Sequence, residues 1–252
     1  MFDTLRQIVS DHIKYWPQIK GLAKSELKKS YRGSSLGWAW AFANPVVRVC
    51  VYLFAFSIGL RQNKDIGEFS YFNWLLCGLI VWFMVQKVFV GGATCIKRYR
   101  FLVTKIKFPV SLIPTFTSLA ELLVHLIIVA ATMVIFMICG HAPTIYWLQI
   151  PIYILMLFLF SCSWGLFAGC LSTMSMDFQQ LVRSFSMAIF WLSGTFFSFD
   201  GMRMLYQVIL CINPVAIIVK GYRDCFIYGR WFWENPWILE GLAVYIILTL
   251  LA

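Results

Sequence analysis

VSLIPTFTSLAELLVHLIIVAATMVIFMIC, residues 110–139, holds one carboxylate, Glu121, and neither lysine nor arginine. An α-helix crosses the hydrocarbon core of a bilayer with about 20 predominantly apolar residues. The stretch is long enough to do so, and Pro109 before it and Pro143 after it punctuate its two ends. It therefore predicts a membrane-spanning helix.

The rest of the chain has the same character. Hydrophobic residues make up 61% of the 252 residues and charged residues only 13%, a balance outside the range of ordinary water-soluble domains. We therefore predict an all-α integral membrane protein with about six transmembrane helices in one membrane domain, residues 36–252. Besides 110–139, the expected spans are about 36–60, 71–93, 147–174, 181–197 and 236–252.

Residues 1–35 differ from the spans. Lysine and arginine alternate there with aliphatic and aromatic side chains, the pattern of an amphipathic helix lying in the head-group plane, and Pro17 is expected to divide it. A solvated basic tail is the alternative. No short apolar core marks a cleavable signal peptide.

The positive charge indicates orientation. Most lysines and arginines near helix ends fall in residues 1–35 and in the loop after the second span, which predicts that both termini are cytoplasmic. The net charge of +10 is then matched by anionic lipid head groups, and no nucleic-acid partner is expected. The last span reaches Ala252 without a basic stop, which suggests that a natural C-terminal tail is missing.

The segment at about 199–236 does not fit an ordinary span. Its apolar pieces are too short to cross a bilayer, and Asn213 and Pro214 separate them. A re-entrant helical hairpin before the last helix is predicted, with two ordinary outer-face helices as the alternative. Most of the 8 cysteines lie in or beside apolar runs and are interpreted as small hydrophobic residues. A disulfide between Cys211 and Cys225 is the minor alternative.

The sequence lacks the residue constellations of known catalysts. It contains no nucleotide-cradling glycine-rich loop, no cluster of cysteine and histidine, no metal-binding pair of carboxylates and no nucleophile elbow. The chain is therefore predicted to be neither an enzyme nor a metalloprotein.

Charged groups inside the predicted spans are candidate functional residues, because burying charge in lipid is costly. Arg48 lies in the first span, and Glu121 with His125 lies on one face of the third. A structural Arg48–Glu121 ion pair or contact with an anionic substrate would both account for them. Lys87, near the end of the second span, is expected to reach the head groups with its long side chain.

Aromatic residues make up 18% of the chain and include 11 tryptophans, many of them at helix ends. Most are expected to belong to the interfacial aromatic belt. A subset facing a conduit would instead stack against sugar rings. The candidates for this role are Trp38, Trp40, Trp74 and Trp82.

An ordered series of short motifs resembles a known family. It begins with Tyr31, Leu36-Gly37-Trp38-Ala39-Trp40 and Asn44-Pro45, and continues with Gly78-Leu79-Ile80-Val81-Trp82-Phe83, Lys105-Ile106-Lys107-Phe108-Pro109, Ile113-Pro114, Asp177, Asn213-Pro214 and Tyr222-Arg223-Asp224. In this order the motifs resemble the polysaccharide-exporting ABC-2 permeases, the teichoic-acid translocation permeases most closely. The stretch Ser193-Gly194-Thr195-Phe196-Phe197 departs from many members, which carry a proline there.

The resemblance implies a machine of several subunits in a bacterial plasma membrane. A homodimer of this chain would join two copies of a cytoplasmic ABC ATPase, which would bind ATP and Mg²⁺, so no cofactor is expected in this chain. Residues 1–35 would act as a cytoplasmic gate, and about Thr94 to Phe108 as the helix that couples the chain to the ATPase. The coupling residues would be Lys97, Arg98, Tyr99, Arg100 and Lys105.

The implied cargo is a polyprenyl-diphosphate-linked teichoic acid, with O-antigen, capsular polysaccharide or another lipid-linked glycan as alternatives. A small drug is a further cargo of the same class, and a membrane-embedded enzyme or channel without an ATPase is the alternative from another class. Basic residues at the cytoplasmic mouth would attract the diphosphate. The candidate substrate or conduit residues are Arg32, Trp38, Trp40, Arg48, Trp74, Trp82, Glu121 and Tyr222.

Overall fold

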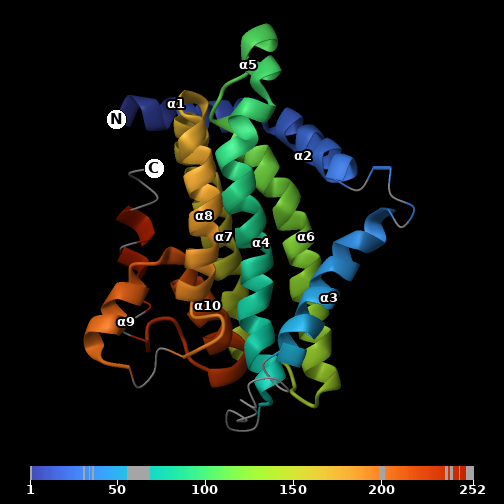
Figure 1. The fold of residues 1–252 in the computed structure, drawn as a ribbon, viewed down its shortest axis with the longest axis vertical. Coiled ribbons are helices and arrows are strands. Elements are labelled where there is room, and N and C mark those ends of the chain that lie inside the picture. Colours follow the sequence, from blue (N-terminus) through green and yellow to red (C-terminus); the bar gives the residue numbers. More distant parts are fainter. Residues whose placement is uncertain are drawn as a thin grey trace.

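The computed structural model describes residues 2–30, 32–33, 35, 37–55, 69–198, 202–235, 238, 241–243 and 245–247. This part of the chain folds into helices with short connections, as predicted for an all-α protein. Figure 1 shows long helices running side by side, with α1 and α2 lying across one end.

The elements are α1 (Phe2–Lys14), α2 (Trp16–Ser30), η1 (Gly37–Ala39), α3 (Trp40–Leu53), α4 (Tyr71–Arg98), α5 (Arg100–Ile106), α6 (Leu112–Ile138), η3 (Ile145–Gln149), α7 (Ile150–Met174), α8 (Met176–Leu192), α9 (Met204–Cys211), α10 (Pro214–Arg223) and the π-helical turn η4 (Asp224–Tyr228).

Helix α4 is the centre of the bundle, surrounded by α6, α7, α8 and α10 (Figure 1). Side chains on all of its faces are buried, which suits its nearly continuous apolar sequence. It approaches α7 closely where glycines meet: a Cβ added at Gly92 would lie 3.0 Å from the Cα of Gly165. One turn further on, a Cβ at Gly169 would lie 2.8 Å from the side chain of Ile96. Small residues at such crossings let helix backbones pack closely in membranes.

Three helical stretches of the described chain are long and apolar enough to cross a membrane: Tyr71–Ile106, Leu112–Ile138 and Ile145–Met174. They correspond to the second, third and fourth predicted spans. Helices α3 and α8 match the first and fifth, but they have 14 and 17 residues. The expected last span falls largely outside the described residues. The number of six spans therefore stays a prediction.

Two predicted boundaries were wrong. The second span was expected to end near Ala93, but α4 continues to Arg98 because its Thr94–Arg98 turn has no helix-breaking residue. Residues Met176 to Gln179 fall between the fourth and fifth predicted spans, yet they open α8. The hydroxyl of Ser175 accepts a hydrogen bond from the Phe178 amide, and the acidic Asp177 suits the first turn of a helix.

The N-terminal segment forms the predicted pair of helices, α1 and α2. The break falls at Tyr15, so that Pro17 occupies the first turn of α2, where its missing N–H costs nothing. Ile19 and Ala23 of α2 are buried against the bundle, whereas Ile13 is 74% exposed. One face of α2 thus packs on the bundle, and the position of α1 and α2 in the head-group plane stays a prediction.

The segment before the last predicted span contains two short helices, α9 and α10, interrupted at Asn213–Pro214 as predicted. The Asn213 side chain caps α10 by accepting a hydrogen bond from the Val215 amide at 3.0 Å. Helix α10 is buried inside the bundle against α4 and α7. A backbone too short to span is tolerated at membrane depth when protein covers it, so the re-entrant prediction is compatible with this burial. Cys225 is a free, buried thiol, and the side chain of Cys211 lies outside the described part.

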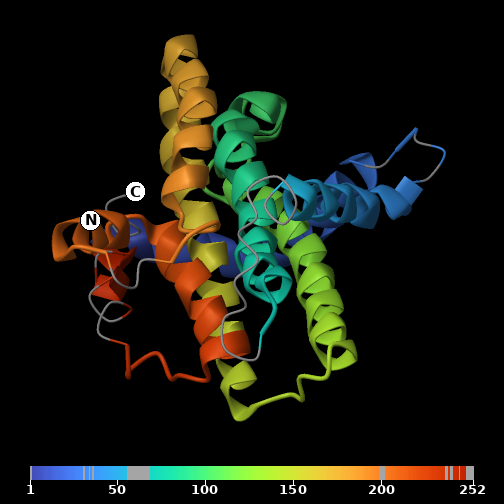
Figure 2. The same cartoon turned by 60° about the horizontal axis from the view of Figure 1, so that its bottom comes forward.

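We refer below to the two ends of the bundle as the α5 end, where α1, α2 and α5 lie, and the α10 end, where α9 and η4 lie (Figure 1). Helix α3 diverges from the bundle at its beginning, as Figure 2 shows from a second direction. Its outer side chains are exposed, Val46 at 58% and Val47 at 59%. Space therefore remains between α3 and the central helices.

Candidate functional site

A pocket of about 480 Å³ occupies this space between α2, α3, α4 and α6. We call it the α3 pocket. Its volume is within the usual range for small-molecule sites. The polar residues that line it are Glu26 and Ser30 of α2, Asn44 and Arg48 of α3, Gln86, Lys87 and Arg98 of α4, and Thr117, Ser118, Glu121 and His125 of α6.

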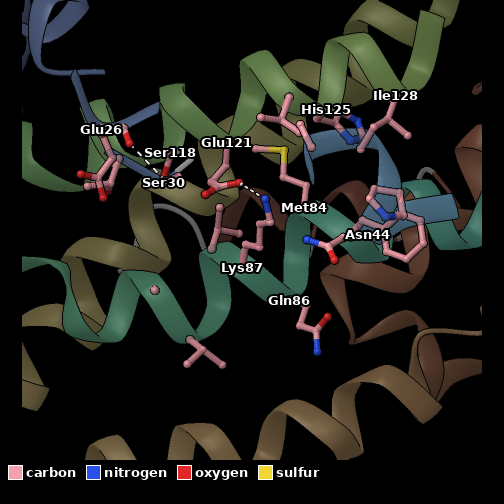
Figure 3. Close-up of a pocket in the computed structure, with 18 of the residues that line it drawn as sticks. Glu26, Ser30, Asn44, Met84, Gln86, Lys87, Ser118, Glu121, His125 and Ile128 are labelled. Carbon is pink, nitrogen blue, oxygen red and sulfur yellow. Dashed lines mark hydrogen bonds and ion pairs between the residues drawn. The ribbon is translucent and has the colours of Figure 1, made fainter. Parts of the chain in front are cut away.

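An ion pair crosses the middle of the α3 pocket. Lys87 Nζ lies 2.9 Å from a carboxylate oxygen of Glu121, so the lone lysine of the second predicted span meets the lone acid of the third. In Figure 3 the two side chains approach each other from α4 and α6, with Glu26 toward one end and His125 toward the other. The partner of Glu121 is therefore Lys87; the predicted pair with Arg48 is wrong, and Lys87 does not extend alone to the head groups.

Helix α3 presents a polar face to the same pocket. Trp40, Asn44 and Arg48 recur every four residues, which places them on one side of the helix, and all three line the pocket. The guanidinium of Arg48 donates a hydrogen bond to the side-chain carbonyl of Gln86 on α4. The hydrogen-bond partner that the described part of the chain offers to Arg48 is thus a neutral amide.

A cluster that we call the α2 clamp lies at the α5 end of the pocket: Glu26, Arg98 and Tyr99. The Glu26 carboxylate accepts a hydrogen bond from the Tyr99 hydroxyl and lies 3.2 Å from an Arg98 nitrogen. Glu26 and Tyr99 are each 8% exposed. A buried carboxylate costs free energy unless it is paired and hydrogen-bonded, and here it has both kinds of partner. The clamp thereby fastens α2 to the junction between α4 and α5.

A second polar contact fastens α1. Nε2 of His12 lies 2.7 Å from Oγ1 of Thr115 on α6, and its Nδ1 lies 2.7 Å from the backbone carbonyl of Ile8. Two polar contacts therefore add to the apolar packing of Ile19 and Ala23 in holding the N-terminal helices, one on α6 and one at the junction of α4 and α5. Movement of α2 relative to α5 would have to break the clamp.

The opposite end of the bundle is held by a different group, which we call the Arg223 hub. Arg223 is 5% exposed, and its two terminal nitrogens donate to the carbonyls of Gly194 and Thr195, each at 2.7 Å. Its guanidinium carbon lies 3.3 Å from the centre of the Trp74 ring, a cation–π contact. A Cβ at Gly78 would lie 3.1 Å from an Arg223 nitrogen, so the glycine makes room for it. The hub joins α10 to α4 and to the segment after α8.

The predicted substrate residues fall into separate groups. Trp40, Arg48 and Glu121 come together in the α3 pocket. Tyr222 is fully buried one layer behind it, with its hydroxyl 2.8 Å from Nε2 of the pocket residue His125.

The other four lie elsewhere. Trp74 belongs to the Arg223 hub, and Trp82 packs on Phe190, with 4.6 Å between ring centres. Both are buried inside the subunit, at 2% and 3% exposed. Arg32 is exposed in the turn after α2. The side chain of Trp38 lies outside the described part.

The predicted coupling residues also fall into two groups, one exposed and one in contact with α2. Lys97, Arg100 and Lys105 are exposed at the α5 end, where a partner protein could reach them. Arg98 pairs with Glu26, and Tyr99 is buried. Arg98 and Tyr99 therefore hold α2, while the other three offer a basic surface.

Sequence reasoning missed Glu26, Gln86 and Arg223. Glu26 carried a signal, because it is an acid surrounded by lysines in a basic helix. Arg223 was quoted within a motif, but it was not weighed as a charge inside the predicted re-entrant hairpin. No local signal marked Gln86, because its role depends on where α3 crosses α4.

Comparison with known proteins gives one consistent result. The sequence profile of the ABC-2 type transporter family matches residues 17–227. The chain is 26% identical over 226 residues to the O-antigen export system permease protein RfbA of Myxococcus xanthus, and the match covers 89% of this chain and 85% of that protein. Two proteins of the same name from Klebsiella pneumoniae are 24% and 23% identical, covering 86% and 82% of this chain and 83% and 79% of their own. The profile match contains the α3 pocket, the α2 clamp and the Arg223 hub.

Proposed function

The chain belongs to the ABC-2 type transporter family, and on this premise we propose that it is the permease for a lipid-linked polysaccharide. ABC-2 permeases are transport subunits that work with an ABC ATPase. The observation that carries the choice of cargo is the similarity, along 89% of the chain, to a relative named as an O-antigen export permease. ATP and Mg²⁺ are bound by the partner ATPase in this proposal.

The arrangement at the α5 end supports a role in energy coupling. Helix α5 continues from the central helix α4, and the α2 clamp braces the joint between them. Lys97, Arg100 and Lys105 around this joint are exposed. A push on α5 is therefore transmitted both to the core through α4 and to the interfacial helix α2 through Glu26. We propose that two copies of the chain form the conduit and that two ATPase subunits act on α5 from the cytoplasm of a bacterium.

The cargo is proposed to be a polymer attached to a polyprenyl diphosphate. An O-antigen-like glycan is the first candidate because of the names of the relatives, and teichoic acid is the second because of the motif resemblance described above. The two differ chemically, since one is a chain of sugars and the other a chain of polyol phosphates.

Depletion of the protein tests this function. We expect lipid-linked polymer to accumulate inside the cell and the surface polymer to fall, because polymerisation continues while export stops. Hydrolysis and sugar analysis of the trapped polymer then distinguish sugars from polyol phosphates. Unchanged surface polymer after complete depletion would contradict the proposal. Co-purification of the chain with a soluble ATPase, against a control pull-down with an unrelated membrane protein, tests the partner independently.

A further inference from the structure

We propose that the α3 pocket binds the phosphate group of an anionic membrane lipid, with Arg48 as the recognising cation. The residues that line this pocket all belong to one subunit. The inference rests on the proposed function only for the choice of a polyprenyl diphosphate as one of the two possible lipids.

The charged side chains that line the pocket favour an anionic ligand. Three cations line it, and two of them face carboxylates: Lys87 pairs with Glu121 at 2.9 Å, and Arg98 with Glu26 at 3.2 Å. Arg48 instead donates to the uncharged side chain of Gln86. Among the described residues that line the pocket, the cations therefore outnumber the carboxylates by one. A cation within a predicted membrane span is costly without a counter-charge, and the planar fork of arginine matches two phosphate oxygens at once.

The pocket has both a polar and an apolar wall, which favours an amphiphilic ligand. Asn44, Gln86 and Ser118 offer hydrogen-bonding groups near the charges, while Phe83, Met84 and Ile128 give the same pocket an apolar side. A ligand with a charged head and a hydrocarbon tail would contact both walls, whereas a free inorganic anion would leave the apolar wall exposed to water. The pocket is therefore suited to an amphiphile.

The position of the pocket indicates how a lipid would reach it. Glu26 and Ser30 of the amphipathic helix α2 line one end, so the pocket begins at the level of that helix (Figure 3). The neighbouring Lys24, Lys28 and Lys29 are exposed, and basic side chains on an interfacial helix attract anionic lipid. A phosphate would pass from the head-group layer along the pocket to Arg48. Beside the pocket, the exposed side chains of Val46 and Val47 on α3 offer an apolar surface along which the tail would lie.

Lipid binding by the purified full-length chain tests the site. The protein is placed in phosphatidylcholine nanodiscs and titrated with phosphatidylglycerol or with a long-chain polyprenyl diphosphate. Native mass spectrometry then measures occupancy. We expect Arg48→Gln to weaken binding of the preferred lipid at least tenfold and Arg48→Lys to weaken it less. The matched control Arg183→Gln, which removes an exposed arginine outside the pocket, is expected to bind like the unmodified chain.

The two lipids separate the possible sources of the phosphate. Tenfold tighter binding of the polyprenyl diphosphate identifies the cargo, and equal binding of the two identifies a resident phospholipid; both results support the site if they depend on Arg48. Equal binding by Arg48→Gln and the unmodified chain overturns it. An equal loss in Arg183→Gln also overturns it, because general charge would then explain the affinity.

A second variant keeps the test decisive if Arg48→Gln does not fold. Asn44→Phe fills the pocket from α3 and leaves Arg48 in place, and it is expected to weaken binding by a similar factor. Tryptophan fluorescence during heating checks that each variant is folded. If depletion leaves the surface polymer unchanged while Arg48 still controls lipid binding, the proposed function fails and the site stands. If depletion lowers the surface polymer but Arg48→Gln binds lipid like the unmodified chain, the proposed function stands and the proposed lipid site is overturned.

Discussion

The Arg223 hub and the α3 pocket both bury charge between helices, but they do so in opposite ways. In the hub, the guanidinium of Arg223 donates to backbone carbonyls and is covered by the ring of Trp74. In the pocket, charged side chains meet across open space, and Lys87 and Glu121 remain 47% and 26% exposed in their side chains. The hub is a packed joint, whereas the pocket is an open space between helices.

This difference predicts which parts of the subunit move relative to one another. Packed helix contacts have few alternative arrangements, whereas ion pairs bordering a cavity can exchange partners at small cost. We expect α4, α7 and α10 to move as one body and α2 with α3 to move relative to it. The following changes test that division, in order of their expected effect on stability.

The largest loss is expected from Arg223→Met. The substitution leaves the carbonyls of Gly194 and Thr195 without their donor, at roughly 1–3 kcal/mol for each buried unpaired group. Thermal unfolding in detergent would show a clearly lowered midpoint or no folded protein. Arg203→Met, which removes an exposed arginine, is the control. Equal midpoints for the two variants would contradict the hub.

Gly221→Ala is expected to have the next largest effect. A Cβ at Gly221 would lie 2.1 Å from the ring of Tyr153, so α10 must shift from α7, and overpacking of this kind typically costs about 1–3 kcal/mol. Gly91→Ala is a matched control, because a Cβ there meets nothing within 4 Å. The difference between the two unfolding midpoints measures the close contact. If Gly91→Ala were the more damaging, the packing described for α10 would be wrong.

The α2 clamp should be less important for stability and more important for transport. Tyr99→Phe removes one hydrogen bond to Glu26, worth about 0.5–1.5 kcal/mol. We expect export to fall more than the unfolding midpoint does, because α2 is no longer tied to α5. The check is surface polymer in cells matched for protein level. Tyr146→Phe, at a half-buried tyrosine of the other end, serves as the comparison. Export by Tyr99→Phe equal to that of the unmodified chain would exclude the clamp from coupling.

The Lys87–Glu121 pair should contribute under about 1 kcal/mol, because both side chains remain partly exposed. Lys87→Met alone leaves Glu121 uncompensated, so the double variant Lys87→Met/Glu121→Leu should be more stable than the single one. Unfolding midpoints of the two single variants, the double variant and the unmodified chain form a double-mutant cycle. Additive changes would show that the pair does not interact.

The smallest effect on stability is expected at α5. Reversing the charges of Lys97, Arg100 and Lys105 to glutamate changes only exposed side chains, so folding should be intact. We expect the partner ATPase to bind less well and export to fall. Co-purification measures the binding, and Arg203→Glu at the other end is the control for added negative charge. Retained binding and export would count against the coupling role of these residues.

The helices were predictable to the extent that their signals are local. The apolar runs at 71–93, 110–139 and 147–174 correspond to α4, α6 and the stretch from η3 to α7. Their ends were less accurate: Thr94–Arg98 contains no helix-breaking residue, and α4 continues through it to Arg98. The start of α8 was missed because the cap at Ser175 was not recognised as a helix signal.

The sequence alone determined that the chain is helical, apolar and suited to a membrane, and that its basic residues gather at one end. These properties depend on composition and on residues a few positions apart, so the sequence alone is enough to predict them. Only the tertiary structure decided that Glu121 faces Lys87 instead of Arg48 and that Glu26 reaches Tyr99. Such pairs depend on how each helix is rotated about its own axis and where it crosses its neighbours. Side chains far apart in the chain determine those angles jointly through close packing.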